Sequence, residues 1–220
     1  MALNKLKFNS INVTPAANEA LKFNSSANGF ETGSAGGAMT FIKKLTASSS
    51  GTLSFVDGSS DVVLDNTYKE YIFYFNNIHP STDGAFFSVG FRDGSTDYDA
   101  SKTTTYFQSR HDEGDSDTQL AHNASYDLAN GTGFQYLSQS LANENDACLG
   151  GFLHLFNPSS TTFVKHFMAR TQQMTDADFS FDIHVAGYCN VTAAIDAVQF
   201  KFNTGNIDAG TIKLYGIKGS

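Results

Sequence analysis

The stretch from Tyr68 to Pro80 constrains the fold more than any other part of this chain. Side chains alternate between the two faces of a strand, so Tyr71, Phe73 and Phe75 would share one face. The other face would hold Ile72, Tyr74, Asn76 and Ile78. Both rows are mainly aromatic or aliphatic, which suits a pleated surface. We therefore predict a central strand that is buried on both sides near its middle and ends at His79-Pro80.

Further short runs of alternating or apolar residues follow, with turn signals between them and no pattern of a regular helix. The runs cover residues 39–47, 51–56, 61–64, 85–91, 103–109, 151–156, 162–169, 179–185, 198–202 and 210–217. We expect the last run to pair with the central strand. The pattern predicts an all-β fold, an antiparallel two-sheet sandwich that is jelly-roll-like, with an extended N-terminal arm.

The first 38 residues differ from the rest of the chain. The sequence LKFNS occurs at residues 6–10 and again at residues 21–25, and each copy predicts a short strand. A strand pair this short is marginal alone, so its apolar side chains need a partner. These candidate contact residues are Leu6, Phe8, Ile11, Val13, Leu21 and Phe23. Residues 33–38 predict a glycine-rich hinge. We therefore expect an attachment segment at residues 1–38 and a sandwich domain at residues 39–220, the alternative being that residues 1–32 form the edge of the sandwich.

Two polar segments are candidate recognition loops. Residues 92–102 follow a predicted strand, and residues 110–147 hold few apolar anchors and many Asp, Asn, Ser and Gln residues. Loops as long as the segment at residues 110–147 are uncommon in compact domains and are often functional. We predict one helical turn in this longer segment, at residues 135–142.

The charge distribution argues against nucleic-acid binding. The chain has a net charge of −8, and residues 51–150 hold fifteen acidic but only four basic residues. Binding to nucleic acid requires neutralisation of phosphates by lysine and arginine. The sequence contains no run of 18 apolar residues, which a membrane span would need. The first residues lack the apolar core of a secretion signal. We expect synthesis in the cytoplasm. Cys148 and Cys189 lack a metal-binding spacing, which favours free thiols over one disulfide.

The acidic loop at residues 112–117 is the principal candidate for a metal site. Asp112, Glu113, Asp115 and Asp117 are closely spaced carboxylates of the kind that binds calcium, but they do not match an EF-hand. A solvated acidic loop is the favoured interpretation, so we expect no metal and no cofactor. Of the six histidines, His111 and His122 flank this loop and form the one pair worth a metal test.

The sequence contains none of the common motifs that would indicate an enzyme. The nucleophile motif GxSxG, the dinucleotide motif GxGxxG and the Walker A motif are all absent. Sugar binding would have to use tyrosine because the chain has no tryptophan. The candidates for exposed sugar-binding rings are Tyr98, Tyr106, Tyr126 and Tyr136, although ordinary core or rim aromatics are the favoured interpretation. We expect a protein that is not an enzyme.

Three stretches carry a resemblance to a known group of proteins. They are NVTPAA at residues 12–17 with NSSANG at residues 24–29, EYIFYFNNIHP at residues 70–80, and GNIDAGTIKLYGI at residues 205–217. In these stretches the chain resembles small virion structural proteins of tailed phages of marine bacteria. The resemblance implies a virion location, as a tail-fibre-like appendage or a head decoration that projects from the particle. It carries no catalytic residue over to this chain.

These observations give three expectations for function. The first is a non-enzymatic virion component that contacts capsid or tail proteins through residues 1–38. The second is a host-glycan receptor-binding module that uses the loops at residues 92–102 and 110–147. The third, a depolymerase or lysin, is disfavoured because no motif supports it. We expect a homotrimer in which three arms cover each other's apolar residues, with a dimer and then a monomer as alternatives.

Overall fold

The computed structural model describes residues 19–34 and 38–218. The chain divides into two compact units at the Ala38–Met39 boundary, and each unit is described by itself. Within the described residues, secondary structure consists of strands and one short 3₁₀ turn. The strands are β1 (Glu19–Phe23), β2 (Phe30–Ser34), β3 (Met39–Thr46), β4 (Leu53–Val56), β5 (Glu70–Pro80), β6 (Phe87–Arg92), β7 (Lys102–Asp112), β8 (Thr118–His122), β9 (Gln135–Tyr136), β10 (Leu149–Phe156), β11 (Lys165–Met174), β12 (Phe179–Cys189), β13 (Ala197–Phe202) and β14 (Ile207–Ile217), and the 3₁₀ turn η2 spans Ala124–Tyr126.

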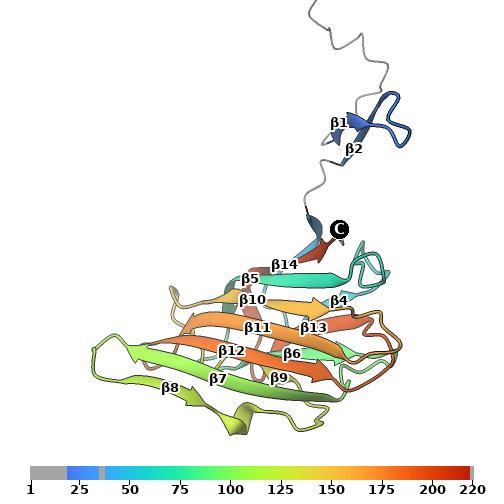
Figure 1. Cartoon of the computed structure of the whole chain (residues 1–220). Coiled ribbons are helices and arrows are strands. Elements are labelled where there is room, and N and C mark those ends of the chain that lie inside the picture. Colours follow the sequence, from blue (N-terminus) through green and yellow to red (C-terminus); the bar gives the residue numbers. More distant parts are fainter. Residues whose placement is uncertain (1–18, 35–37, 219–220) are drawn as a thin grey trace, which may run out of the picture. The chain divides into compact units, whose positions relative to one another are not determined.

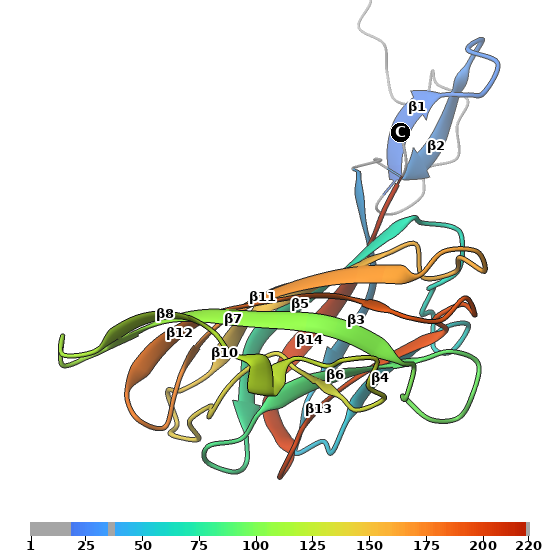
Figure 2. The same cartoon turned by 60° about the horizontal axis from the view of Figure 1, so that its bottom comes forward.

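The second unit is an antiparallel sandwich of two sheets, as predicted. The large sheet has the strand order β3-β14-β5-β10-β11-β12-β7-β8, and the small sheet has the order β4-β13-β6-β9. Figures 1 and 2 show the small sheet lying along one face of the large one. The finer expectation of a jelly roll stays a prediction.

Phenylalanine is the most frequent residue in the core between the sheets. Phe200 of β13 lies at its centre, with ring centroids 5.4 Å from Phe73, 5.2 Å from Phe75 and 5.8 Å from Phe87. The contacts to Phe73 and Phe75 are edge-to-face, a favourable arrangement for aromatic rings. Because Phe73 and Phe75 belong to β5 and the other two rings to the small sheet, this cluster joins the two layers.

β5 is the predicted central strand, and β14 pairs with it as expected. Tyr71, Phe73 and Phe75 are buried, but the prediction that the opposite face is also buried is wrong. Tyr74 is 38% exposed because no layer formed by the described residues covers the outer face of the large sheet there. Ile78 is fully buried although alternation placed it on that outer face. The reason is a β-bulge at Asn77, where the backbone has φ 52° and the register with β10 gains one residue.

Two further local predictions are wrong. Residues 61–64 form no strand but part of a loop in which the Asp57 carboxylate accepts a hydrogen bond from the backbone N–H of Leu64 at 2.8 Å. Residues 135–142 form no helical turn but contain β9 and an irregular segment, in which Leu137 and Leu141 are buried. The Thr171 hydroxyl donates a hydrogen bond to the Leu137 carbonyl, which ties this segment to the large sheet. The segment at residues 110–147 is therefore largely a structural part of the sandwich.

The first unit, as far as it is described, is a β-hairpin. Its register pairs Leu21 with Thr32 and Phe23 with Phe30. The second LKFNS copy thus supplies a strand, as expected, whereas the first copy lies outside the described residues. Gly33 and Ser34, which were predicted to begin a hinge, belong to β2 instead.

Candidate binding surfaces

The hairpin of the first unit has one apolar face. Phe23 and Phe30 stack with their ring centroids 4.9 Å apart, and Leu21 lies on the same face. Phe23 is 65% exposed, Phe30 is 46% exposed and Leu21 is 49% exposed. The opposite face carries the ion pair between Lys22 and Glu31 at 3.3 Å. Two five-residue strands cannot cover such a face themselves, so it is available to a partner.

Of the predicted attachment residues, Leu21 and Phe23 thus share an exposed face, and Phe30 joins them. Phe30 was not among the predicted residues because it lies beyond the repeat, but the turn signal at Asn28-Gly29 indicates the strand that contains it. Leu6, Phe8, Ile11 and Val13 lie outside the described residues.

The outer face of the large sheet carries a second set of exposed aromatic rings. Phe41, Tyr215, Tyr74 and Phe152 follow one another across β3, β14, β5 and β10, with successive centroids 5.5, 5.8 and 6.3 Å apart. Phe41, Tyr74 and Phe152 are 54%, 38% and 37% exposed. The part of this face on β5 was predicted to be buried, so sequence reasoning missed it as a surface.

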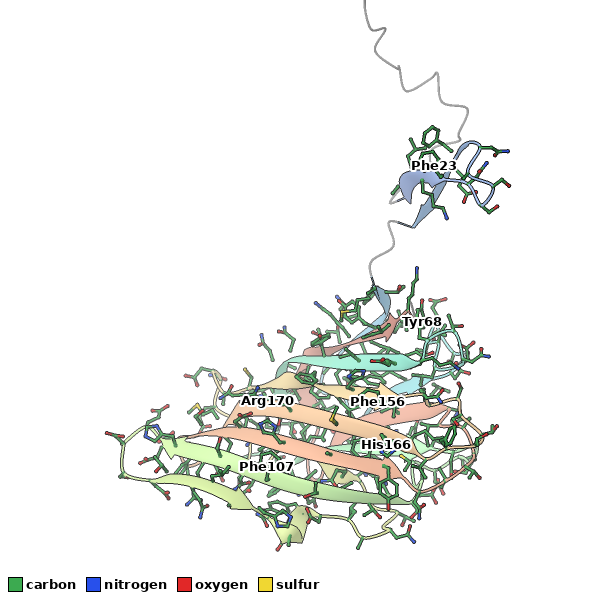
Figure 3. All side chains as sticks on the ribbon, viewed as in Figure 1. Phe23, Tyr68, Phe107, Phe156, His166 and Arg170 are labelled. Atoms are coloured by element: carbon green, nitrogen blue, oxygen red, sulfur yellow. The ribbon has the colours of Figure 1, made fainter. Side chains whose placement is uncertain are left out.

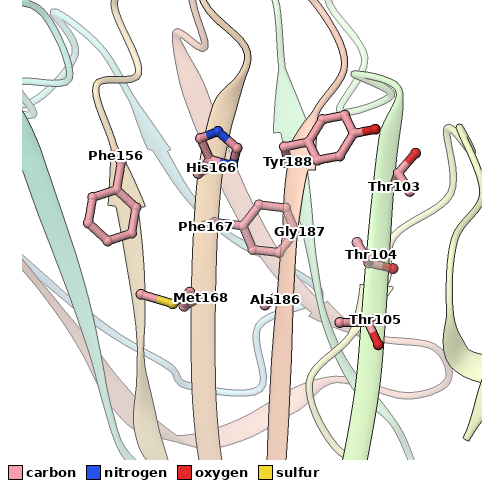
Figure 4. A pocket seen from close by; sticks show the side chains of 10 residues that line it. All are labelled: Thr103, Thr104, Thr105, Phe156, His166, Phe167, Met168, Ala186, Gly187 and Tyr188. Atoms are coloured by element: carbon pink, nitrogen blue, oxygen red, sulfur yellow. The ribbon is translucent and has the colours of Figure 1, made fainter. Parts of the chain in front are cut away.

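A groove of about 520 Å³ lies further across the same face, over β10, β11, β12 and β7 (Figure 4). Ala186 stands between its cross-strand neighbours Met168 and Thr105 and presents only a methyl group. Tyr188 stands between His166 and Thr103, with the His166 and Tyr188 rings 6.0 Å apart. The groove forms because the small side chain of Ala186 is surrounded by larger ones.

Charged groups lie beside the groove rather than in it. Arg170 donates two hydrogen bonds to Asp182, each 2.8 Å long. The hydrogen bond from Arg170 and that from His184 lower the pKa of the Asp182 carboxyl against the opposing effect of burial. The His184 ring also stacks on Phe107 with centroids 4.7 Å apart and planes 10° apart. Figure 3 shows Phe107, Phe156, His166 and Arg170 along this sheet.

The four predicted metal-binding carboxylates lie at the turn between β7 and β8. Asp112 accepts hydrogen bonds from the Ser116 hydroxyl at 2.6 Å and from the Asp117 backbone N–H at 2.7 Å. These bonds lower the pKa of the Asp112 carboxyl to about 2. Asp117 pairs with Arg110 at 2.7 Å. Within residues 19–34 and 38–218, no three or more His, Cys, Asp or Glu side chains form a group that could hold a metal ion.

The predicted histidine pair is not brought together either. His111 contacts Asp115 at 3.1 Å, and His122 contacts Asp127 at 2.8 Å. Each imidazole therefore has its own carboxylate partner close by in the sequence.

The predicted sugar-binding tyrosines are mostly structural. Tyr106 is fully buried because its position on β7 faces the core, which agrees with the favoured interpretation of a core aromatic and rules it out as an exposed sugar-binding ring. Burial raises the pKa of its phenol. Tyr126 contacts Tyr106 and Tyr136 with centroids 5.1 and 5.8 Å apart, so these rings pack on one another. Tyr98 is half-buried. The exposed rings lie instead on the outer sheet face, where Tyr188 on β12 is half-buried.

Two lysines and a cysteine are buried together at one end of β7, β11 and β12. Lys102 on β7 and Lys165 on β11 are both fully buried, and both are cross-strand neighbours of Cys189 on β12. The Lys102 ammonium donates to the carbonyls of Ala100 and Gly133 at 2.9 and 2.8 Å. Burial lowers the pKa of both lysines and raises the pKa of the Cys189 thiol to about 12. Cys148 and Cys189 are free thiols, as predicted.

No helix in the described part of the chain is long and apolar enough to cross a membrane. Comparisons with protein-family models, with curated proteins and with solved structures found no match to this chain.

Proposed function

We propose that this chain is a non-enzymatic structural component of a tailed-phage virion, attached through its N-terminal unit and projecting its sandwich from the particle surface. The resemblance of three stretches to phage virion proteins motivates the proposal. The observation that carries it is the exposed apolar face of the hairpin, formed by Leu21, Phe23 and Phe30. An apolar face on a hairpin too small to bury it is a contact surface that calls for a partner.

The partner of the hairpin is, in this proposal, first another copy of the same chain and then the capsid or tail. Three hairpins around a threefold axis would cover one another's phenylalanines and shield their open strand edges. A homotrimer is therefore the proposed state, and the sandwich, with its own full core, needs no partner to fold.

The test uses the full-length chain with Phe23→Asp and Phe30→Asp together. We expect light scattering to show a trimer for the original chain and a monomer for the variant, and we expect the variant to be lost from purified particles. The control is Phe163→Asp, which changes an equally exposed ring (69%) in the sandwich and should alter neither property. A monomeric original chain would refute the trimer, and normal incorporation of the variant would refute attachment through the hairpin.

A second candidate function is contact with a glycan on the host surface. The observation that favours it is the exposed aromatic outer face of the large sheet, rather than the loops at residues 92–102 and 110–147. Much of the longer segment is used in packing, and Lys102 and Leu137 within these segments are fully buried. Adsorption of the chain to host cells, and its loss when outer-face rings are replaced, would test this role.

A further inference from the structure

The groove over β12 is lined by side chains without formal charge. Its lining residues are Thr103, Thr104, Thr105, Phe156, His166, Phe167, Met168, Ala186, Gly187 and Tyr188. Its volume of about 520 Å³ lies within the range of ~300–1,000 Å³ that is typical of small-ligand sites. Two pairs lie beside the groove and outside its lining: Arg170 with Asp182 at 2.8 Å, and His154, which lies opposite Met168, with Glu70 at 2.9 Å.

One aromatic platform lies in the groove lining, where Tyr188 contacts His166. A second lies just beyond the lining on the same sheet face, where His184 stacks on Phe107. Tyr188 and His184 are four residues apart on β12, so their Cα atoms are about 13 Å apart along the strand. Ala186 lies midway between them, on the same face. Ala186 therefore forms a low floor between the two aromatic pairs, which lie on the same face of the sheet.

Polar groups line the space between the platforms. Within the described residues, no side-chain hydrogen bond engages the Thr105 hydroxyl, the Tyr188 hydroxyl or the His166 ring. The Thr103 hydroxyl accepts a bond from the Asn130 N–H at 3.1 Å and keeps its own proton to donate. The groove therefore offers aromatic faces together with hydrogen-bonding groups that have no protein partner.

From this combination we infer that the groove binds a neutral oligosaccharide. A sugar ring has an apolar C–H face, which packs on an aromatic ring, and hydroxyls at its rim, which exchange hydrogen bonds with threonine, tyrosine and histidine. An anionic polymer would find no cation in the lining. A peptide strand would need a free sheet edge, whereas the groove lies on a sheet face. The inference rests on the proposed glycan contact and assigns it a place and a ligand class.

The experiment measures binding of neutral hexasaccharides to the full-length chain by isothermal titration calorimetry. The probes are cellohexaose, laminarihexaose and mannohexaose, with an alginate hexasaccharide as the anionic comparison. Tyr188→Ala removes one platform and Ala186→Phe fills the floor, whereas Tyr215→Ala removes an outer-face tyrosine away from the groove. Circular dichroism and thermal melting check that every variant is folded.

We expect at least one neutral probe to bind, and the anionic probe not to bind. Tyr188→Ala should weaken binding about tenfold, which is what the loss of one aromatic contact amounts to. Ala186→Phe should abolish binding, and Tyr215→Ala should leave it unchanged.

Several outcomes would overturn the inference. They are binding of no neutral probe, preference for alginate, or equal affinity in the original chain and both groove variants. An oligomer of the original chain that Ala186→Phe dissociates would show that a second copy occupies the groove instead. The hairpin variant with Phe23→Asp and Phe30→Asp separates the two proposals. It should bind sugar normally while failing to assemble, so failure of attachment and failure of sugar binding are read independently.

Discussion

At the scale of single residues, Phe200 illustrates how the sandwich is held together. It is fully buried and contacts rings from both sheets, so its removal would leave a cavity between rigid layers. Neighbouring side chains on paired strands cannot collapse far into such a space.

Phe200→Ala should therefore lower the free energy of unfolding by about 3–5 kcal/mol. Urea denaturation followed by circular dichroism measures this change. Phe163→Ala removes a ring that is 69% exposed and should change the free energy by less than about 0.5 kcal/mol. Equal effects of the two substitutions would contradict the proposed role of the central phenylalanine.

The buried thiol of Cys189 makes the free energy of unfolding fall as the pH rises in the alkaline range. Burial raises the pKa of its thiol from 9.0 to about 12 in the folded state. Between these values the unfolded chain releases this proton and the folded chain keeps it, so stability falls as pH rises. Lys102 acts in the opposite direction, because burial lowers the pKa of its ammonium below 10.5 and the unfolded chain then binds more protons.

The variant Cys189→Ala isolates the thiol, since the lysines and buried tyrosines stay in place. Relative to the variant, the original chain should lose up to about 1.4 kcal/mol of unfolding free energy per pH unit above pH 9. Urea denaturation of both chains at pH 8, 9 and 10, with a reducing agent present, measures the difference. Parallel pH profiles would show that the thiol ionises equally in both states.

At the scale of elements, the bulge in β5 decides which side chains reach the core. Asn77 at φ 52° turns Ile78 inward, and the facing strand β14 accommodates the bulge at Gly210, which has φ 114°. A Cβ atom at Gly210 would collide with the backbone of Asn77 and Ile78. The glycine is therefore required both by its own conformation and by the close approach of β5.

Gly210→Ala should lower the free energy of unfolding by about 2 kcal/mol or more, since a strained backbone and a steric overlap add together. Gly150→Ala is the matched control. Gly150 lies in strand β10, and a Cβ atom there would meet nothing within 4 Å. Thermal melts of the two variants provide the comparison, and similar melting temperatures would argue against the close contact.

The elements also show which features a sequence can predict. The strand at residues 179–185 was located correctly, because its apolar and polar residues alternate with a period of two. Ile78 was placed on the wrong face, since a bulge changes the period without a local signal. The outer face of β5 was expected to be covered, because aromatic residues such as Tyr74 do not reveal whether a layer lies over them. The groove was missed for a related reason, since it depends on which residues on four strands become neighbours.

At the scale of the whole molecule, the hydrophobic core among the described residues belongs entirely to the second unit, between Ala47 and Leu214. The first unit contributes no buried hydrophobic residue within residues 19–34. The core of the sandwich and the proposed attachment surface therefore lie in different parts of the chain.

A chain that begins at Met39 should accordingly melt within about 3 °C of the full-length protein, because about 1 kcal/mol corresponds to a shift of roughly 2–4 °C in a domain of this size. Differential scanning calorimetry measures both transitions at the same protein concentration. A much lower melting temperature of the shortened chain would mean that residues 1–38 stabilise the sandwich.

The strand order has a consequence for synthesis on the ribosome. β14 pairs with β3 on one side and with β5 on the other, and Met39 lies opposite Ile217. β3 therefore has no partner in the large sheet until the last strand has been translated. Such distant pairing slows folding and leaves strand edges open in nascent chains. Lys43 and Lys44 on β3 would then protect the waiting edge from pairing with neighbouring nascent chains during translation.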